Sequence, residues 1–396
     1  MNEVKKIILI HYGEIALKKG NRNFFINVLK QNIKEYFFDL KPDIKLEESR
    51  IILSFNDDID FIKIKERLKK ISGIASFAYA FITNENDPQK ISEIIYENLF
   101  KKSTNFKTFA ISTKRSYKLF PYTSLEINSI IGRYIKEKTL KSVNLSKPDL
   151  IVTIEVLKNH IIFYSEIEKG MGGLPSGSSG KLVCLISGGI DSPVAAWRMI
   201  KRGAKIIFVH LHSYPYHNNT SQQKVKDIVK VLTHYQINSK LYLVPFGEIQ
   251  AKIKINIKAP YRIVVYRRMM LRIAQQIAEI EKASGIITGE SLGQVSSQTL
   301  CNLATINSAV KIPVLRPLIG MDKNEIIKQA KDIGTFDIST IKDQDCCQLF
   351  TPKHPATKTN EKTIEKIEAE ISDELNKSIH SSIQNSQIIN FTIKEL

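Results

Sequence analysis

The stretch that decides the fold is LISGGIDSPVAAW, residues 185–197, in which a glycine-containing loop joins two apolar segments. The segment before the loop, KLVCLI, is short and almost wholly apolar, which is typical of a parallel strand covered on both faces. After the loop, Pro193 suits the first position of a helix that Gly203 can end. Asp191 or Ser192 can cap that helix. Two glycines next to a helix N-terminus indicate anion-binding geometry.

Strand and helix patterns alternate along the chain after this loop. The further strand candidates are KIIFVHLH (205–212), KLYLVPF (240–246) and SGIITG (284–289), and helical stretches such as SQQKVKDIVKVLTHY separate them. This alternation predicts a doubly wound, mostly parallel α/β sheet with its ligand at the carboxyl ends of the strands. The loop lacks the Gly-Lys-Ser/Thr of a Walker motif, so by itself it leaves both a phosphate site and an ordinary strand-to-helix turn open.

The first 165 residues read differently, as two small α+β units in tandem. Strand patterns such as KKIILIHYGEI and DLIVTIEVLK alternate there with amphipathic helical patterns such as NFFINVLKQNIKEYFFDL. The Gly/Ser-rich stretch KGMGGLPSGSSGK follows and is the clearest predicted domain boundary in the chain.

Composition limits the class of protein. The chain has 396 residues, 43% of them hydrophobic, and no apolar run long enough to span a membrane, so we expect a soluble protein of two or three domains. The apolar run near the N-terminus is short and is soon followed by charged residues, which predicts a first strand rather than a signal peptide. Four cysteines without a CxxC pair predict a reducing cytoplasm and weigh against a zinc ribbon or an iron–sulfur site.

Positive charge is concentrated in two segments. The net charge is +18; residues 101–150 carry 11 Lys or Arg against 3 acids, and residues 249–278 carry 7 cations and no acid. Clusters of this kind suit a phosphate backbone, so they favour a nucleic-acid partner over a merely solvated surface.

Seven motifs together resemble one family, with order and spacing kept from about residue 1 to 360. They are YGEIALKKGNR, TKRSYKLFPYTSLEIN, GMGGLPSGSSGKLVCLISGGIDSPVA, YRRMMLRIA, TGESLGQVSSQTL, LRPLIGMDKNEII and DCCQLFTPKHPATK. The chain resembles the tRNA uridine 4-sulfurtransferases, or 4-thiouridine synthetases. SGGIDS itself is similar to the pyrophosphatase loop of enzymes that split ATP into AMP and pyrophosphate.

The resemblance implies a domain order and an activity. It implies a ferredoxin-like domain (1–60), an RNA-binding THUMP domain (61–168), a linker (169–180) and a pyrophosphatase-loop domain of the adenine nucleotide alpha hydrolase-like class (181–396). Such an enzyme uses ATP and Mg²⁺ to adenylate uridine 8 of tRNA at O4, then replaces that oxygen with persulfide sulfur from a cysteine desulfurase. A homodimer in the cytoplasm is also implied. Some members supply sulfur for the thiazole of thiamine, a role tied to a C-terminal rhodanese domain that we do not expect here.

Site residues carry over by position in these motifs. Asp191 is expected to act through Mg²⁺ on the departing pyrophosphate, without any protein-only metal site, and Lys323 to approach the phosphates. Cys347 matches the sulfur-transfer cysteine, with Cys346 as its less certain neighbour. The expected nucleotide contacts are Leu185, Ile186, Ser187, Gly188, Gly189, Ser192, His210, Leu211, Arg267, Gly289 and Gln298.

Local patterns suggest structural roles for several other residues. Asp322 and Glu325 have the spacing of a capping box that opens a helix. Arg268 and Arg272 are spaced as a solvated basic helix face. Cys184, within a predicted buried strand, is expected to pack in the core, and Cys301 to be structural as well.

One alternative role for two histidines and two rival functions for the whole chain are also considered. His210 and His212 share one face of a strand, so a metal pair is conceivable, but no further ligand cluster supports it. Amidotransferases such as GMP synthetase, and lysidine synthetase, share the ATP chemistry, yet neither accounts for the Cys-Cys stretch and the basic N-terminal region. An RNA-binding adaptor with a degenerate nucleotide site is the non-enzymatic alternative, and the intact SGGIDS argues against it.

Overall fold

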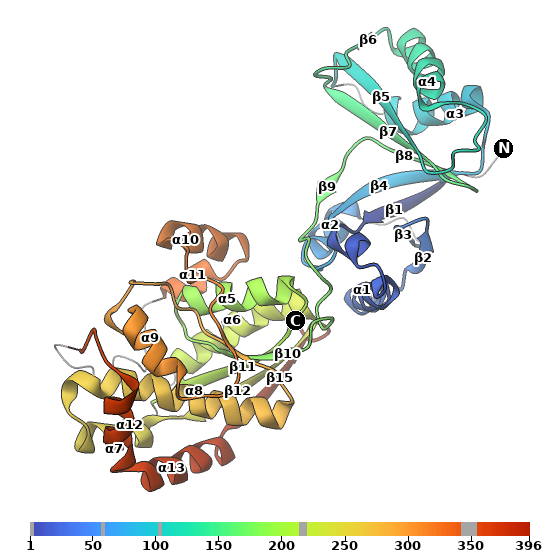
Figure 1. Cartoon of the computed structure of the whole chain (residues 1–396). Coiled ribbons are helices and arrows are strands. Elements are labelled where there is room, and N and C mark those ends of the chain that lie inside the picture. The colour runs from blue at the N-terminus through green and yellow to red at the C-terminus, as the bar shows by residue number, and fades with distance from the viewer. Residues whose placement is uncertain (1–3, 57–59, 102–104, 214–219, 342–354) are drawn as a thin grey trace. The chain divides into compact units, whose positions relative to one another are not determined.

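A computed structural model describes the chain over residues 4–56, 60–101, 105–213, 220–341 and 355–396. The chain divides into two units, Met1–Gly173 and Leu174–Leu396 (Figure 1). Over the described residues, no helix combines the length and the apolar character that a membrane crossing requires.

The first half of the N-terminal unit is a β-α-β-β-α-β motif. Its elements are β1 (Lys5–His11), the 3₁₀ turn η1 (Glu14–Leu17), α1 (Arg22–Tyr36), β2 (Asp43–Glu47), β3 (Arg50–Ser54), α2 (Phe61–Leu68) and β4 (Ser76–Thr83). Helix α1 buries Ile26, Leu29 and Ile33, whose spacing of three and four residues forms one apolar stripe. Strand β1 pairs antiparallel with both β3 and β4. The amphipathic pattern of the sequence therefore predicts these helices correctly.

The second half of the unit extends the same sheet. Its elements are α3 (Pro88–Ile95), the π-helical turn η2 (Tyr96–Phe100), β5 (Thr108–Arg115), α4 (Ser124–Thr139), β6 (Ser142–Val143), β7 (Leu150–Val156), β8 (Ile161–Tyr164) and β9 (Glu168–Lys169). The strand order is β2-β3-β1-β4-β8-β7-β5-β6, with β9 also paired to β4. Because β4 pairs with β1 on one edge and β8 on the other, the two predicted tandem units share one continuous sheet.

The C-terminal unit is the predicted doubly wound α/β fold. Its strands are β10 (Lys181–Leu185), β11 (Lys205–His212), β12 (Asn238–Pro245), β13 (Ile286–Ile287), β14 (Val314–Leu315) and β15 (Gln387–Thr392). The order is β14-β13-β10-β11-β12-β15, in which only β15 runs antiparallel to its neighbour. The helices and turns are α5 (Asp191–Lys201), α6 (Thr220–Gln236), α7 (Gly247–Asn256), η3 (Ala259–Tyr261), α8 (Arg262–Glu281), η4 (Ser296–Gln298), α9 (Leu300–Asn307), α10 (Lys323–Asp332), α11 (Phe336–Thr340), α12 (Glu361–Ala369) and α13 (Ser372–Gln384).

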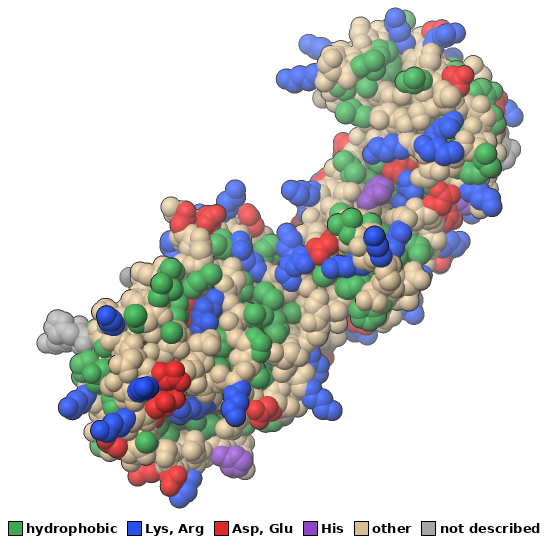
Figure 2. All heavy atoms as spheres, viewed as in Figure 1, with side chains coloured by type: hydrophobic (Ala, Val, Ile, Leu, Met, Phe, Trp, Pro, Cys, Tyr) green, Lys and Arg blue, Asp and Glu red, His purple; other side chains and the backbone are tan. Residues whose placement is uncertain are grey.

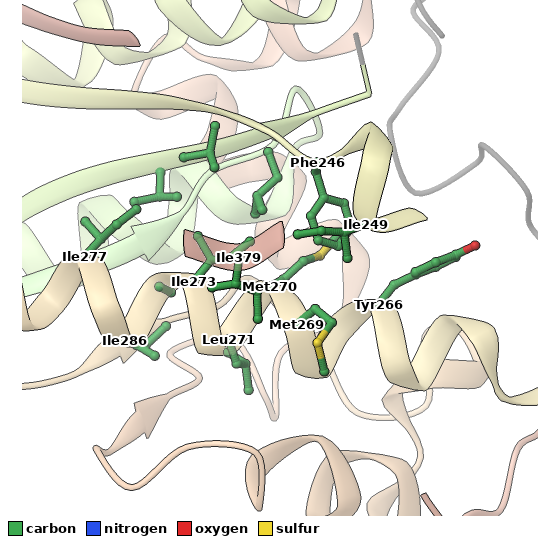
Figure 3. Close-up of a cluster of buried hydrophobic side chains, with 14 of the residues drawn as sticks. Phe246, Ile249, Tyr266, Met269, Met270, Leu271, Ile273, Ile277, Ile286 and Ile379 are labelled. Atoms are coloured by element: carbon green, nitrogen blue, oxygen red, sulfur yellow. The ribbon is translucent and has the colours of Figure 1, made fainter. Parts of the chain in front are cut away.

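Helix α8 forms the centre of the main core of this unit. Figure 3 shows Met269, Met270, Ile273 and Ile277 of α8 in one cluster with Phe246, and all five are at most 5% exposed. Burying an apolar side chain of this size stabilises the fold by about 1.5–3 kcal/mol. This core fixes α8 to the sheet, and Met270 also reaches the pocket described below.

The strand order places a topological switch point at β10. The chain passes from β10 to β11 on one side of β10, whereas β13, which comes later in sequence, lies on the other side. Ligands of open α/β sheets bind outside the carboxyl ends of the strands at such a point. The SGGIDS loop begins at the carboxyl end of β10.

The Gly/Ser-rich segment between the units is hydrogen-bonded at both of its ends. Gly172 N donates to Ile74 O within the N-terminal unit (2.7 Å). Leu174 N donates to Lys201 O (3.0 Å) and Ser179 N to Gly203 O (2.9 Å), both within the C-terminal unit. Gly203 has a φ of +88° and follows the end of α5, as the sequence predicts.

Candidate functional site

The SGGIDS loop is held in shape by its own two serines. Ser187 N donates to Ser192 Oγ (2.9 Å), and Gly189 N donates to Ser187 Oγ (3.3 Å). These bonds close the loop over the N-terminus of α5. A loop closed in this way presents backbone groups and a helix end to an anionic ligand.

Two details at the start of α5 differ from the prediction. Pro193 is the third helical residue rather than the first, and it fits there because the first four N–H groups of a helix have no intrahelical acceptor. The cap position is Ile190, without any side-chain cap, so neither Asp191 nor Ser192 caps the helix. The Ser192 hydroxyl bonds to the loop instead, and the Asp191 carboxylate is left for other partners.

A pocket of about 260 Å³ opens beside this loop. The predicted nucleotide contacts all line it except Gly188, whose Cα faces the aliphatic part of Lys224 instead. The pocket residues come from the carboxyl ends of β10 and β11, from α8, and from the segment after β13. They are Leu185, Ile186, Ser187, Gly189, Asp191, Ser192, Val209, His210, Leu211, Arg267, Met270, Thr288, Gly289, Glu290, Gln294, Val295 and Gln298. The sequence prediction missed Val209, Met270, Thr288, Glu290, Gln294 and Val295.

Asp191 and Lys323, far apart in the sequence, meet at this pocket. Lys323 Nζ lies 2.5 Å from Asp191 Oδ1, and Gln294 Nε2 donates to Asp191 Oδ2 (3.2 Å). Lys323 is the first residue of α10, whose N-cap Asp322 forms the predicted capping box with Glu325. The capping box thus fixes the backbone that carries Lys323 to the pocket.

Glu290 is a buried carboxylate in the pocket wall. It is 2% exposed and accepts hydrogen bonds from Thr288 Oγ1 (2.8 Å) and Arg316 Nε (2.7 Å). Arg267 Nη1 lies 3.6 Å from its other oxygen, Oε1. Since a buried carboxylate needs such partners, Glu290 anchors Arg267 against the pocket. In the sequence, the only sign that Glu290 lies at the pocket is its position directly after Gly289 in TGES.

The sequence leaves the two histidines of β11 open as a possible metal pair, and the described residues add no third ligand to them. His210 Nδ1 lies 3.0 Å from Ile186 O, which orients the ring toward the end of β10. Burial and, to a lesser degree, the charge of His210 lower the pKa of His212 to about 4, so His212 is neutral at physiological pH. Within the described part of the chain, no three His, Cys, Asp or Glu side chains group as metal ligands.

The pocket can still accept a magnesium ion that arrives with a nucleotide. Mg²⁺ is held in many sites by one or two carboxylates plus phosphate oxygens, and the Asp191 carboxylate supplies such oxygens beside the SGGIDS loop. Gln298 fits a nucleotide as well: it is 6% exposed, and its Oε1 is buried without a hydrogen-bond partner in the described structure. An orphaned buried acceptor in a pocket wall suits the amino group of a base.

The four cysteines divide into three kinds. Cys184 is fully buried in β10, as predicted, and burial raises the pKa of its thiol. Cys301 lies on an exposed face of α9, so it does not pack in the core as Cys184 does. An eight-residue helix has one buried stripe, and Cys301 falls outside it. Cys346 and Cys347 lie outside the described residues.

The described residues on either side of 342–354 are hydrogen-bonded to other parts of the C-terminal unit. Ser339 Oγ donates to Gly189 O (3.4 Å), and Lys224 Nζ donates to Ile341 O (2.7 Å). On the other side, Ala356 N donates to Pro260 O (2.9 Å), shortly before α8. Of these described residues, Ser339 contacts the SGGIDS loop itself.

Most cations of the basic segment 249–278 bind other groups of the same chain. Arg268 is 1% exposed and donates from Nε to Glu368 Oε1 (2.7 Å), and Arg272 Nη2 donates to Glu368 Oε2 (2.5 Å). The expected solvated basic face is therefore wrong for Arg268, because a buried guanidinium needs a buried carboxylate. Arg262 likewise donates to two backbone carbonyls.

The basic segment 101–150 is mostly exposed. Figure 2 shows Lys and Arg side chains spread over the visible face of the molecule. Arg115 donates to the backbone oxygens of Lys118 (3.2 Å) and Tyr122, which holds the loop between them. The exposed cations of the segment are Lys101, Lys107, Lys114, Lys118, Arg133, Lys136, Lys138 and Lys147. They can reach a phosphate backbone without leaving any buried carboxylate unpaired.

Comparison with protein families gives three matches. The family described as Thiamine biosynthesis protein (ThiI) matches residues 177–372, the ThiI ferredoxin-like domain matches residues 7–78, and the THUMP domain matches residues 88–166.

Similar proteins cover nearly the whole chain. A probable tRNA sulfurtransferase of Thermoanaerobacter sp. (strain X514) is 43% identical over 366 residues, which span 91% of this chain and 94% of that protein. One from Acetivibrio thermocellus is 39% identical over 98% of this chain and 100% of that protein. The crystal structure of a 4-thiouridine synthetase–RNA complex with bound ATP is 34% identical, covers 98% of this chain and 100% of that one, and has a TM-score of 0.89.

Proposed function

The chain belongs to the ThiI family of tRNA sulfurtransferases, and from that premise we propose that it converts uridine 8 of tRNA to 4-thiouridine with ATP. One observation carries the proposal. A pocket built on the SGGIDS loop has the Asp191–Lys323 pair at its edge, in a chain that superposes on an ATP-bound 4-thiouridine synthetase.

The need for ATP follows from the chemistry of uracil. The C4 carbonyl is amide-like and its oxygen is a poor leaving group. Attack of O4 on the α-phosphorus of ATP forms an O4–AMP bond and releases pyrophosphate, and AMP is then a good leaving group. Donors of the SGGIDS loop and the N-terminus of α5 would bind the phosphates, and Lys323 would offset charge on them as the pyrophosphate departs.

A magnesium ion bound with ATP would neutralise charge on the pyrophosphate. Asp191 would hold that ion, since its carboxylate lines the pocket and is already oriented by Lys323 and Gln294. Arg267, anchored by Glu290, would bind the nucleotide from α8.

Sulfur then enters from a persulfide on Cys347. The terminal sulfur attacks C4, a C4–S bond forms, and the C4–O bond to AMP breaks as AMP leaves with its electron pair. The remaining bond between this sulfur and the Cys347 sulfur must be cleaved by two electrons from a second thiol, such as Cys346, or from an external thiol reductant. The hydrogen bond from Ser339, which precedes the range containing Cys347, to Gly189 of the SGGIDS loop supports this role for Cys347.

The remaining assignments concern partners. The exposed cations of residues 101–150 support tRNA binding by the N-terminal unit. The family likeness supports a cysteine desulfurase as persulfide donor and a homodimer as the functional state.

Product analysis tests the proposal. Purified protein with ATP, tRNA and a persulfide donor should release AMP and pyrophosphate only with tRNA, and nucleoside mass spectrometry should detect 4-thiouridine at position 8. An amidotransferase or a lysidine synthetase would yield an aminated or lysine-bearing product instead. An adaptor with a degenerate site would bind tRNA but release no pyrophosphate, and either result would contradict the proposal.

A further inference from the structure

A second pocket of the C-terminal unit, the lysine pocket, lies between the start of α8 and α12. It has a volume of about 540 Å³, and Figure 1 shows α7 and α12, which both contribute to it, side by side. Lys258 comes from the segment between α7 and η3, whereas Lys362 and Lys366 come from α12. The other lining residues are Asn256, Tyr261, Thr363, Ile367 and Glu370. Three cations therefore share this pocket with a single carboxylate.

The three lysines of this pocket have no partner within the described chain. All three are exposed, and none of their ammonium groups makes an ion pair or a hydrogen bond with another described residue. By contrast, Lys252 on the neighbouring helix α7 is paired with Glu248 (2.8 Å). Lys362 and Lys366 are four residues apart on α12, and like charges at this spacing destabilise a helix slightly. An anion bound in the pocket would offset that cost.

The wall that carries Lys258 and Tyr261 is fixed in place by the protein. Arg262 donates from Nε to Ile257 O (2.8 Å) and from Nη2 to Lys254 O (2.8 Å), which holds the chain between α7 and α8. Tyr261 also packs against the main core of the unit. A preformed wall needs little ordering when a ligand binds, which favours affinity.

The chemistry of the lysine pocket favours a nucleic-acid strand over a small molecule. Six of its eight lining residues are exposed. Small-molecule sites are mostly apolar and enclose most of their ligand, which this pocket does not do. Surfaces that bind single-stranded nucleic acids combine cations for the phosphates with aromatic rings on which a base can stack. The three lysines and the ring of Tyr261 provide that combination.

The lysine pocket and the nucleotide pocket share one helix. Tyr261 directly precedes α8, and Arg267, six residues later on α8, lines the nucleotide pocket. Six residues of an α-helix span about 9 Å, which is the length of about three nucleotides along one strand of a duplex. An RNA whose target base enters the nucleotide pocket can therefore place phosphates of nearby nucleotides at the lysine pocket.

We propose that the lysine pocket is an RNA-binding surface of the C-terminal unit, which binds phosphates of the tRNA close to the base that is modified. The inference rests on the proposed function, which identifies the RNA as tRNA. It adds a few phosphate contacts to those of the exposed cations in residues 101–150. Because most of the affinity for nucleic acids depends on the number of such contacts, the C-terminal unit alone still binds tRNA weakly.

The double variant Lys362→Gln/Lys366→Gln tests the proposal in the full-length protein. Glutamine has nearly the helix propensity of lysine, so α12 should be kept while both charges are lost. At about 0.1 M salt we expect the tRNA affinity to fall about five- to tenfold. The logarithmic salt slope should fall by about 1.4–1.8, because each lost phosphate contact removes about 0.7–0.9. Lys362→Arg/Lys366→Arg keeps both cations and should bind tRNA like wild type.

A matched control removes the same charge elsewhere in the same unit. Lys282 follows the other end of α8, and Lys311 N donates to Gln275 Oε1 (2.8 Å) on that helix. Both lysines are exposed, and neither has an ion-pair partner among the described residues. Lys282→Gln/Lys311→Gln should therefore keep the tRNA affinity within about twofold of wild type if the position of the charge matters more than its amount.

Two binding results would overturn the inference. One is equal tRNA affinity of wild type and Lys362→Gln/Lys366→Gln. The other is an equal loss in both double variants, which would show a dependence on net charge alone. Calorimetric titration with ATP separates a further alternative. If wild type binds two ATP molecules, and Lys362→Gln/Lys366→Gln binds one but keeps its tRNA affinity, the pocket is a site for small phosphates and the inference is wrong.

Nucleoside mass spectrometry of the products separates this inference from the proposed function. If wild type forms 4-thiouridine and the two double variants bind tRNA alike, only the inference about the lysine pocket falls. If wild type forms no 4-thiouridine but Lys362→Gln/Lys366→Gln selectively loses tRNA affinity, the proposed function falls and the RNA-binding surface stands.

Discussion

At the scale of single residues, the site depends on how Asp191 is held. Both of its carboxylate oxygens have partners on other elements, Lys323 on α10 and Gln294 after β13. A carboxylate held in this way needs little reorganisation when a metal-bound nucleotide arrives, which favours catalysis over simple binding. In the proposed reaction, Lys323 would exchange its contact with Asp191 for one with a phosphate of the nucleotide.

The first prediction is that Asp191→Asn abolishes adenylation. The variant keeps the size of the side chain but loses the charge that holds Mg²⁺, so pyrophosphate release should fall by about a thousandfold or more. The melting temperature and tRNA affinity should stay close to those of wild type, because Asp191 does not cap α5. Undiminished pyrophosphate release would remove Asp191 from the phosphate chemistry.

The second prediction concerns the cysteines. Cys347→Ser should eliminate thiolation from a persulfide donor yet preserve adenylate formation, because the thiol acts after ATP is consumed. Free sulfide should restore thiolation in part, since sulfide can attack the adenylate without a carrier. Cys346→Ser should be only partly impaired, because adjacent cysteines pair poorly. Normal thiolation by Cys347→Ser with an inactive Cys346→Ser would reverse the two assignments.

The sequence predicted the location of single residues correctly where that location depends on chain position. The SGGIDS residues and Gly289 follow strands, so their place at the carboxyl ends could be predicted. Glu290 could not, because its main partner, Arg316, lies on the segment after β14 and only the fold brings them together. Arg268 was misjudged for the same reason, since Glu368 comes from α12.

At the scale of elements, the pocket depends on how closely β13 approaches α5. A Cβ on Gly289 would lie 2.7 Å from Ser192 N and 2.9 Å from Asp191 C, both backbone atoms that cannot move aside cheaply. Glycine at this position therefore lets the end of β13 and the start of α5 form one pocket wall.

The third prediction is that Gly289→Ala disrupts nucleotide binding. The clash should displace the SGGIDS loop, lower the affinity for ATP by at least about tenfold and destabilise the unit by about 1–3 kcal/mol. Gly320→Ala is the control: it lies in the same unit, is exposed, and its Cβ would meet nothing within 4 Å. Calorimetric titration with ATP and thermal unfolding measure both effects. Equal ATP affinity in the two variants would show that the close approach is dispensable.

In the N-terminal unit, one buried carboxylate joins four strands. Glu155 of β7 is 1% exposed and bonds to His11 of β1 (3.0 Å), Tyr164 of β8 (2.8 Å) and Arg50 of β3. Burial alone would raise the pKa of Glu155, but the hydrogen bond and charge of His11, the charge of Arg50 and the Tyr164 hydroxyl outweigh it and hold the pKa at about 2.

The fourth prediction follows from the sign of that shift. A carboxyl pKa below its ordinary value of 4.5 adds stability above that pH, and this stability is lost as pH falls toward 2. Glu155→Gln should lower the free energy of unfolding at neutral pH by about 2–4 kcal/mol. The variant should also lose less stability than wild type between pH 4.5 and 2. The exposed Glu137→Gln is the control, and parallel pH profiles of Glu155→Gln and wild type in urea unfolding would contradict the assignment.

Element prediction was accurate where apolar patterns are strong. The runs that became β10, β11 and β12 are apolar because helices cover both faces. Strand β15 was missed: QIINFT pairs antiparallel at an edge and most of its side chains are at least partly exposed, so it lacks a buried strand's pattern. The shared sheet of the N-terminal unit was also missed, because nothing in the local sequence of β4 specifies a partner on its second edge.

At the scale of the whole molecule, the two units suggest a division of labour. The described nucleotide pocket draws all of its residues from the C-terminal unit, whereas the exposed cations of residues 101–150 belong to the N-terminal unit. Within the basic segment 249–278, Arg268 and Arg272 bind Glu368 and are not available to RNA. Of the two segments in which the sequence concentrates positive charge, the one that is mostly exposed, residues 101–150, therefore belongs to the N-terminal unit.

The fifth prediction tests that division with two fragments. The C-terminal fragment should begin at Leu174 rather than Lys181, because Leu174 and Ser179 bond to Lys201 and Gly203 at the end of α5. We expect fragment 174–396 to bind ATP nearly as well as the full chain but tRNA weakly, and fragment 1–173 to keep most of the tRNA affinity. Binding by fragment 1–173 should also weaken steeply with salt, since each phosphate contact contributes about 0.9 to the logarithmic salt slope on a duplex. Filter binding at several salt concentrations measures the tRNA affinity of each fragment and its dependence on salt. If fragment 174–396 binds tRNA as tightly as the full chain, the basic surface of the N-terminal unit has another purpose.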